Sequence, residues 1–123
     1  MQKKILIVDD EREAVEILGK KIGENNYSVM TALTGKDAIS ICNKEKPDLV
    51  ILDIVISDMD GYAVAAALRE NKLLRNVPII FTSGKEFDYA GIEERLSEVG
   101  PCDYMTKPFS VQELLAKIKE ALG

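Results

Sequence analysis

Residues 5–10 read Ile5-Leu6-Ile7-Val8-Asp9-Asp10, an apolar run that ends abruptly in two aspartates. A short apolar run without polar alternation is typical of a strand covered on both faces. Similar runs recur along the chain, at 27–31, 49–52, 79–81 and 103–105. Strands buried on both faces belong to parallel sheets flanked by helices, so this pattern predicts an α/β domain.

Amphipathic helical periods separate the predicted strands. Apolar residues recur at three- and four-residue spacing in the segments 14–22, 38–42, 63–68, 92–99 and 111–122. Ser110 and Glu113 have the spacing of a capping box at the start of the last segment. Pro47 and Pro78 stand just before two strands, and Gly100-Pro101 ends the fourth helical segment. The pattern predicts five βα units in one doubly wound domain.

Composition excludes several classes of protein. The chain has 123 residues, 46% of them hydrophobic and 30% charged, which fits one globular domain. It has no histidine, so histidine-dependent zinc enzymes and triad hydrolases are excluded. Two cysteines are too few for a disulfide framework, and a net charge of -5 argues against direct nucleic-acid binding. No apolar stretch approaches the ~20 residues of a membrane span, so we expect a cytoplasmic protein.

Polar residues follow the predicted strands at their carboxyl ends, where open α/β sheets have their binding crevice. These residues are Asp9, Asp10, Asp53, Thr82 and Lys107. Three converging carboxylates repel one another unless a cation lies between them, and Mg²⁺ prefers such oxygen ligands. An aspartate beside Mg²⁺ can attack a phosphoryl group, while a lysine and a hydroxyl stabilise the phosphoryl oxygens.

These residues lie in short motifs through which the whole chain resembles the receiver domain of two-component response regulators. The motifs occur in family order, each at a strand end: residues 7–10, 52–53 with 58–61, 78–83 and 103–109. Four independent motifs in one order make a specific signal. The resemblance implies a flavodoxin-like sheet of strand order 2-1-3-4-5, with residues 1–123 forming one receiver domain and no output domain.

The resemblance also implies a role for each site residue. Asp53 is expected to be the phosphoacceptor, and Asp9, Asp10, Asp53 and the Val55 main-chain carbonyl are expected to bind Mg²⁺. Lys107 is expected to bind a phosphoryl oxygen, and its peptide bond to Pro108 is expected to be cis.

The implied function is a phosphorylation-controlled switch of a two-component phosphorelay rather than an enzyme acting on external substrates. Thr82 is expected to be the switch hydroxyl, and Tyr104 the aromatic residue that moves with it. A histidine kinase or phosphotransferase would supply the phosphoryl group. A downstream protein would bind the face made by the fourth helix, fifth strand and fifth helix. The chain departs from the family at Ile56-Ser57, where Met-Pro is frequent, and at Ser83 and Gly84.

Other interpretations of the same residues stay open. Asp9 and Asp10 also suit a helix amino terminus, and an aromatic such as Tyr104 commonly packs in a strand. An aspartate-dependent phosphohydrolase is disfavoured because Val55 stands where a second carboxylate would transfer protons. A nucleotide-binding domain lacks its glycine-rich loop after the first strand. A receiver that works unphosphorylated as an interaction module remains the other alternative.

Overall fold

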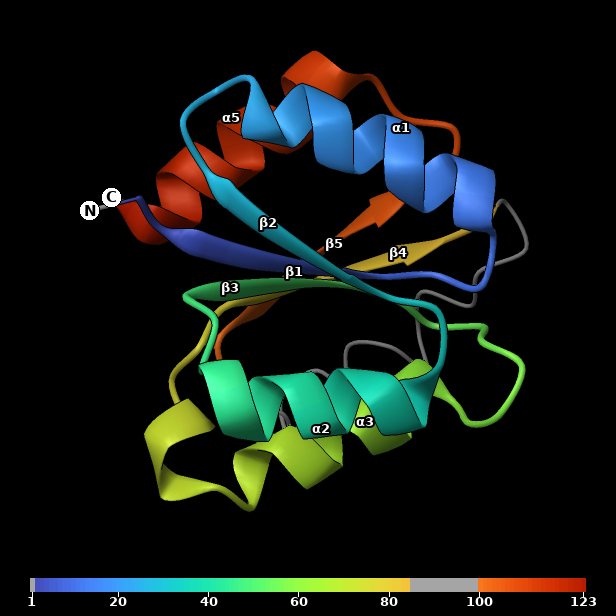
Figure 1. Cartoon of the computed structure of the whole chain (residues 1–123), viewed down its shortest axis with the longest axis vertical. Helices are drawn as coiled ribbons and strands as arrows, with labels where there is room; N and C mark the ends of the chain where they lie inside the picture. Colours follow the sequence, from blue (N-terminus) through green and yellow to red (C-terminus); the bar gives the residue numbers. More distant parts are fainter. Residues whose placement is uncertain (1, 85–99) are drawn as a thin grey trace.

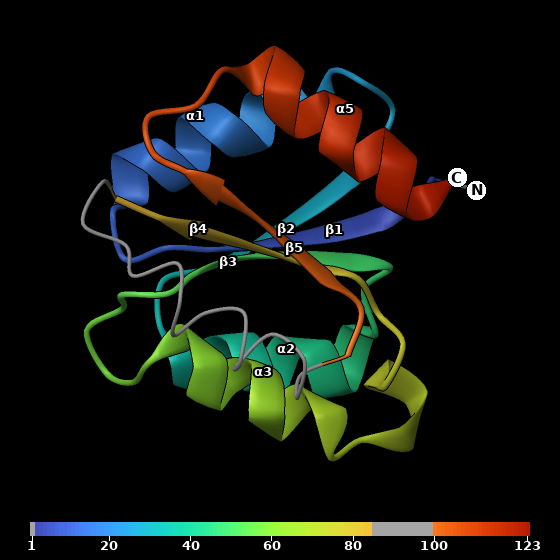
Figure 2. The ribbon, with the colours of Figure 1, turned by 180° about the vertical axis from the view of Figure 1, so that it is seen from behind.

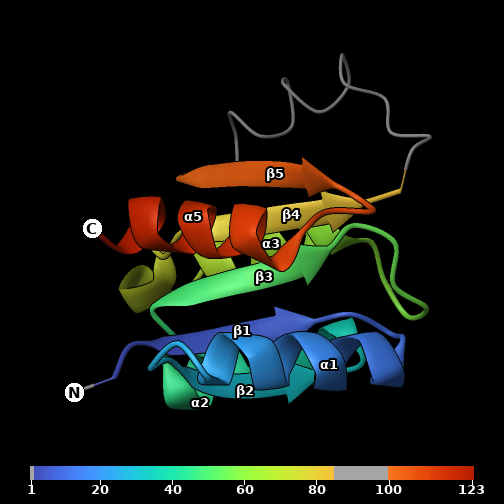
Figure 3. The same cartoon turned by 90° about the horizontal axis from the view of Figure 1, so that it is seen from above.

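Five parallel strands form one sheet in the order β2-β1-β3-β4-β5 (Figure 3). The computed structural model describes residues 2–84 and 100–123. The strands are β1 (Lys4–Val8), β2 (Ser28–Ala32), β3 (Leu49–Asp53), β4 (Ile79–Ser83) and β5 (Cys102–Thr106). The doubly wound fold and its strand order are as expected from the sequence.

Helices cover both faces of this sheet. The elements are α1 (Arg12–Gly23), α2 (Gly35–Glu45), α3 (Gly61–Arg69), the 3-10 turn η1 (Lys72–Leu74) and α5 (Val111–Leu122). Helices α1 and α5 lie on one face, and α2 and α3 lie on the other (Figures 1 and 2). The predicted helical segment at 92–99 falls outside the described residues. None of the helices in the described ranges has the length and apolar character needed to cross a bilayer.

The apolar runs are continuous because the sheet has a core on each side. In β1, Ile5 and Ile7 pack in the cluster beneath α1 and α5, while Leu6 and Val8 pack in the cluster beneath α2 and α3. All four side chains are at most 1% exposed. Successive strand residues point to opposite faces. When both faces are buried, every position in the strand favours an apolar residue.

Side-chain caps fix the starts of α3 and α5. Ser110 Oγ accepts a hydrogen bond from the Glu113 amide at 3.1 Å, which confirms the cap predicted for α5. Asp60 Oδ1 accepts from the Tyr62 amide at 2.6 Å at the start of α3. Each cap satisfies an amide that has no partner within its helix, and so fixes where the helix begins.

Parallel pairing brings all the strand carboxyl ends to one edge of the sheet. Strand β4 continues to Ser83, two residues past the predicted end at Phe81, because Thr82 and Ser83 still pair with Met105 and Thr106 of β5. On its other side, Thr82 is the register partner of Asp53. Both chain ends lie at the opposite edge of the sheet (Figure 3).

Candidate functional site

Buried polar groups gather at the carboxyl edge of the sheet. Within the described ranges, the polar or charged residues that are buried are Asp9, Asp53, Thr82 and Ser83. Asp9 follows β1, Asp53 ends β3, and Thr82 and Ser83 end β4. Burying such groups costs free energy unless they are paired, so their concentration at one place marks a functional site.

Three carboxylates meet there, as the strand-end pattern predicts. Ligand oxygens of Asp9, Asp10 and Asp53 all lie within 4.8 Å of one another. Asp10 is exposed, whereas Asp9 and Asp53 are buried, so the group opens to solvent on one side. Carboxylate oxygens in an open group of this kind suit Mg²⁺, which keeps part of its water shell.

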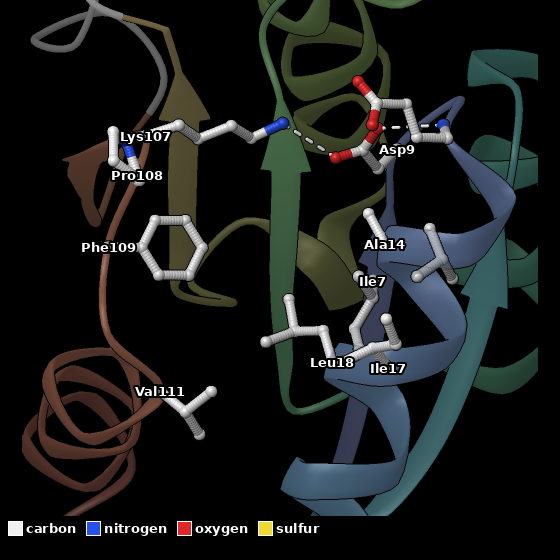
Figure 4. Close-up of a pocket in the computed structure, with 11 residues that line it drawn as sticks. Ile7, Asp9, Ala14, Ile17, Leu18, Lys107, Pro108, Phe109 and Val111 are labelled. Carbon is white, nitrogen blue, oxygen red and sulfur yellow. Dashed lines mark hydrogen bonds and ion pairs between the residues drawn. The ribbon is translucent and has the colours of Figure 1, made fainter.

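Lys107 joins two of the carboxylates. Its Nζ lies 2.8 Å from Asp9 Oδ2 (Figure 4). The same Nζ lies 3.1 Å from Asp53 Oδ2. The side chain reaches them from the segment that follows β5, and the Lys107-Pro108 peptide bond is cis, as expected. One ammonium group therefore offsets part of the charge of the acidic cluster.

Burial and hydrogen bonding shift the pKa of Asp53 in opposite directions, and the same is true of Lys107. Burial raises the pKa of Asp53 above 3.8, and this effect outweighs the hydrogen bonds from Lys107 and Val55, which lower it. Burial by itself lowers the pKa of Lys107, but its hydrogen bonds to Asp9 and Asp53 outweigh burial and raise it. Lys107 is therefore a firmly held cation, beside a carboxylate whose ionisation the fold disfavours.

The loop after β3 adds a backbone group to the site. The Val55 amide donates to Asp53 Oδ1 at 3.1 Å, so Val55 lies directly beside the predicted acceptor. Its side chain is 71% exposed, and its backbone forms an isolated antiparallel bridge with Asp60. The contact that Val55 makes with Asp53 is thus through its main chain, and the role of its carbonyl as a metal ligand stays a prediction.

The two predicted switch residues have different surroundings. Thr82 is 3% exposed and pairs with Asp53 across the sheet, so both belong to the same site. Tyr104 pairs with Phe81 and packs, half-buried, against the core on the α2 and α3 side, with its hydroxyl oxygen buried. This packing fits an ordinary core aromatic, so the switch role of Tyr104 stays a prediction.

Asp9 serves a second purpose at the start of α1. Its Oδ1 accepts a hydrogen bond from the Glu11 amide at 3.0 Å, while its Oδ2 accepts from Lys107. Glu11 itself makes no side-chain cap on α1. One Asp9 oxygen therefore lies at the helix start, as the helix-terminal interpretation expects, and the other faces Lys107 in the acidic cluster, while the metal-binding role of Asp9 stays a prediction.

Sequence reasoning did not find the pocket that opens beside Lys107. It has a volume of about 360 Å³ and lies between α1 and the segment after β5 (Figure 4). Its walls include Leu18 and Phe109, together with Ile17, which is 60% exposed. Apolar residues on an amphipathic helix look alike in sequence whether they face a core or a pocket.

Gly61 and Asp58 also have roles that the sequence did not reveal. A Cβ atom at Gly61 would lie 2.5 Å from the Asp53 carbonyl oxygen, so only glycine lets α3 begin this close to the acceptor. Asp58 binds the amino end of α2 through two backbone amides. Both contacts are tertiary: the motif at 58–61 contains these residues but does not reveal what they contact.

Solved structures with the same architecture define the class of protein. The chain superposes on the chemotaxis protein CheY4 of Vibrio cholerae with a TM-score of 0.92 at 24% identity, over 99% of this chain and 100% of that one. A signal receiver domain of a histidine kinase from Syntrophus aciditrophicus gives a TM-score of 0.85 at 31% identity, over 98% and 89%. The fold is therefore that of the flavodoxin-like α/β signalling domains.

The family follows from the sequence match. The family model of the response regulator receiver domain matches residues 5–119, and the chain belongs to this family. It is 40% identical to the alkaline phosphatase synthesis transcriptional regulatory protein PhoP of Bacillus subtilis, over 99% of this chain and 49% of that protein. The chain thus spans about half the length of this curated relative. Phosphorylation-controlled switching is the general function of the family, whose members interact with histidine kinases or phosphotransferases and downstream effectors.

Proposed function

We propose that Asp53 accepts a phosphoryl group from a histidine kinase or phosphotransferase in a Mg²⁺-dependent reaction. The observation that carries this proposal is the Lys107 ammonium, 2.8 Å from Asp9 and 3.1 Å from Asp53, at a group of three carboxylates. A buried acceptor, a fixed cation and excess negative charge are what phosphoryl transfer with a divalent cation requires.

The donor set of the site fits Mg²⁺. Asp9, Asp10 and Asp53 carry three negative charges and Lys107 carries one positive charge, so the cluster keeps a net charge of about -2. The Val55 main-chain carbonyl is the further ligand that we propose. When bound, Mg²⁺ would neutralise the cluster and withdraw charge from the phosphoryl oxygens.

In the proposed step, an Asp53 carboxylate oxygen attacks phosphorus. A P–O bond forms as the P–N bond of the donor phosphohistidine breaks, and the imidazole nitrogen keeps the electron pair and takes a proton from water. Lys107 pairs with a phosphoryl oxygen as a point charge, and the Thr82 hydroxyl donates a hydrogen bond to another. Because Val55 cannot transfer protons, we expect self-phosphorylation and slow autodephosphorylation rather than turnover of external esters.

The output that we propose is a change in partner affinity. Phosphorylation of Asp53 would favour the arrangement in which Thr82 swings toward the phosphoryl group and the Tyr104 side chain moves inward in step with it. A downstream protein would bind the face that includes β5 and α5. The predicted helical segment 92–99, which would complete this face, falls outside the described residues. The phosphoryl group shifts the equilibrium only by its preference for one of the two arrangements.

We place this exchange in the cytoplasm, with residues 1–123 acting as one receiver domain. Support comes from the cysteines, because no disulfide joins Cys42 and Cys102. Burial raises the pKa of Cys42 to about 12, so its thiol is a core group rather than a reactive one.

Intact mass after incubation with a small acyl phosphate tests the acceptor. We expect the wild type to gain one phosphoryl group only with Mg²⁺, and Asp53→Asn to gain none because an amide is not a nucleophile.

The matched control is Asp37→Asn, which removes an exposed carboxylate on α2 and should be phosphorylated like the wild type. Equal phosphorylation of Asp53→Asn would contradict the proposal. Absence of any gain in the wild type would favour the phosphorylation-independent interaction module.

A further inference from the structure

The β3–α3 loop, residues 54–60, carries part of the site. It contains no proline, so no ring fixes a φ angle within it. Its base is closed by a hydrogen bond of 2.8 Å from the Gly61 amide to the Ile54 carbonyl and by the bridge between Val55 and Asp60. The tip of the loop has to be held by contacts with another element.

Asp58 attaches the tip to the amino end of α2. Its Oδ1 accepts from the Gly35 amide at 2.8 Å, and its Oδ2 accepts from the Lys36 amide at 3.1 Å. The first amides of a helix have no partner within it, and the Thr34 hydroxyl oxygen already accepts from the Asp37 amide. Asp58 therefore completes the cap of a helix that begins 23 residues earlier in the chain.

Charge and packing both support this attachment. A carboxylate at the amino end of a helix interacts favourably with the helix dipole. The hydrogen bonds that it accepts, first that from Gly35, lower the pKa of Asp58. Beside it, Met59 covers Gly35 so closely that a Cβ atom there would lie 2.3 Å from Met59 Cγ. The tip is thus seated on α2 by a hydrogen-bonded carboxylate and by a packed side chain.

The same loop sets the position of Val55. The Val55 amide contacts Asp53 Oδ1, and its carbonyl is the backbone ligand proposed above. If the tip were free, cation binding would have to order the loop, and the lost conformational entropy would weaken binding. Anchoring the tip in advance removes that cost from the binding step.

We propose that Asp58 is a positioning residue for phosphorylation: by binding the amino end of α2, it holds the β3–α3 loop so that Val55 stays in place beside Asp53. This inference rests on the proposed function. It assigns no contact with the phosphoryl group to Asp58, whose effect passes through the loop.

Titration of the full chain with Mg²⁺ alone, followed by NMR, tests the assignment. Asp58→Ala removes both acceptor oxygens, and we expect the Mg²⁺ dissociation constant to rise about 10-fold, as for other groups that orient metal ligands. We also expect a lower order parameter for the Val55 amide. With acyl phosphate, the Mg²⁺ concentration for half-maximal rate should rise while the rate at saturating Mg²⁺ stays near that of the wild type.

Two further variants separate positioning from helix capping. Asp58→Asn keeps one acceptor oxygen without the charge, and its Mg²⁺ affinity should lie between those of the wild type and Asp58→Ala. Asp37→Ala removes a carboxylate from the same first turn of α2 without touching the loop, and it should bind Mg²⁺ like the wild type. If Asp58→Ala does not fold, the Asp58→Asn titration decides the question.

Each failure has its own signature. Wild-type Mg²⁺ affinity and an unchanged Val55 order parameter in Asp58→Ala would overturn the inference and leave Asp58 as a helix cap only. A wild-type chain that binds no Mg²⁺ would overturn the proposed function and this inference together. A loss of affinity in Asp37→Ala equal to that in Asp58→Ala would also overturn it, because helix charge alone would then explain the effect.

Discussion

At the scale of single residues, the buried position of Asp53 makes its ionised carboxylate unfavourable, which lowers the free energy of unfolding when Asp53 is ionised. Its folded pKa lies above 3.8, because burial outweighs its pairing with Lys107. The folded chain therefore binds this proton more tightly than the unfolded chain does. The resulting stabilisation is complete below pH 3.8 and is lost as the pH rises through the folded pKa.

Removing this charge should stabilise the metal-free chain. In EDTA at pH 7, we expect Asp53→Asn to raise the free energy of unfolding by on the order of 1 kcal/mol. The gain should vanish near the acid end of the titration, where Asp53 is protonated in the wild type. Thermal unfolding of both proteins across the pH range measures this, with Glu16→Gln, which removes an exposed carboxylate from the middle of α1, as the control. A gain that persists undiminished in acid would show that charge is not its cause.

At the scale of elements, the site depends on how closely α3 begins behind β3. A Cβ at position 61 would lie 2.5 Å from the Asp53 carbonyl oxygen and 2.7 Å from Ile54 Cα. Both are backbone atoms, so a change of side-chain rotamer cannot relieve the clash. Gly61→Ala should therefore lower the free energy of unfolding by about 1–3 kcal/mol and slow phosphorylation of Asp53 as the strand end shifts.

Denaturant unfolding and the acyl phosphate assay measure the two effects of Gly61→Ala. The matched control is Gly23→Ala at the end of α1, where a Cβ would meet only Val29 at an ordinary distance of 4.0 Å. That variant should retain full stability and the wild-type rate. An unchanged phosphorylation rate in Gly61→Ala would show that the acceptor tolerates displacement of α3.

At the scale of the whole molecule, two cores share one sheet. Ile7 packs beneath α1 and α5, and Ile79 packs beneath α2 and α3, each 1% exposed. Ile7→Val and Ile79→Val should each cost about 1 kcal/mol, and the double variant should lose roughly the sum.

Because the strands belong to both layers, the chain should still unfold in a single transition. Far-ultraviolet circular dichroism and tyrosine fluorescence, followed through the same denaturant titration, should give coincident curves for all three variants. Separate transitions for the two probes would mean that the layers unfold independently.

Much of this architecture could be predicted because its signals are local. The doubly buried run at Ile5–Val8 and the cap at Ser110 depend on neighbours within a few residues. The ends of strands were less predictable, because β4 continues through Ser83 only where β5 supplies partners. The polar residues of the site were found because parallel strands always bring their carboxyl ends to one edge.

The sequence by itself determined the class of fold, the order of its elements and the residues at the strand ends, since periodicity and motif order are properties of the chain. Only the tertiary structure decided that Lys107 joins Asp9 to Asp53, that Gly61 lies against the acceptor and that Asp58 caps α2. The physical reason is that a charge or a glycine in a loop has the same local sequence whether it faces water or a distant backbone. Its free energy depends on the partner that folding brings to it.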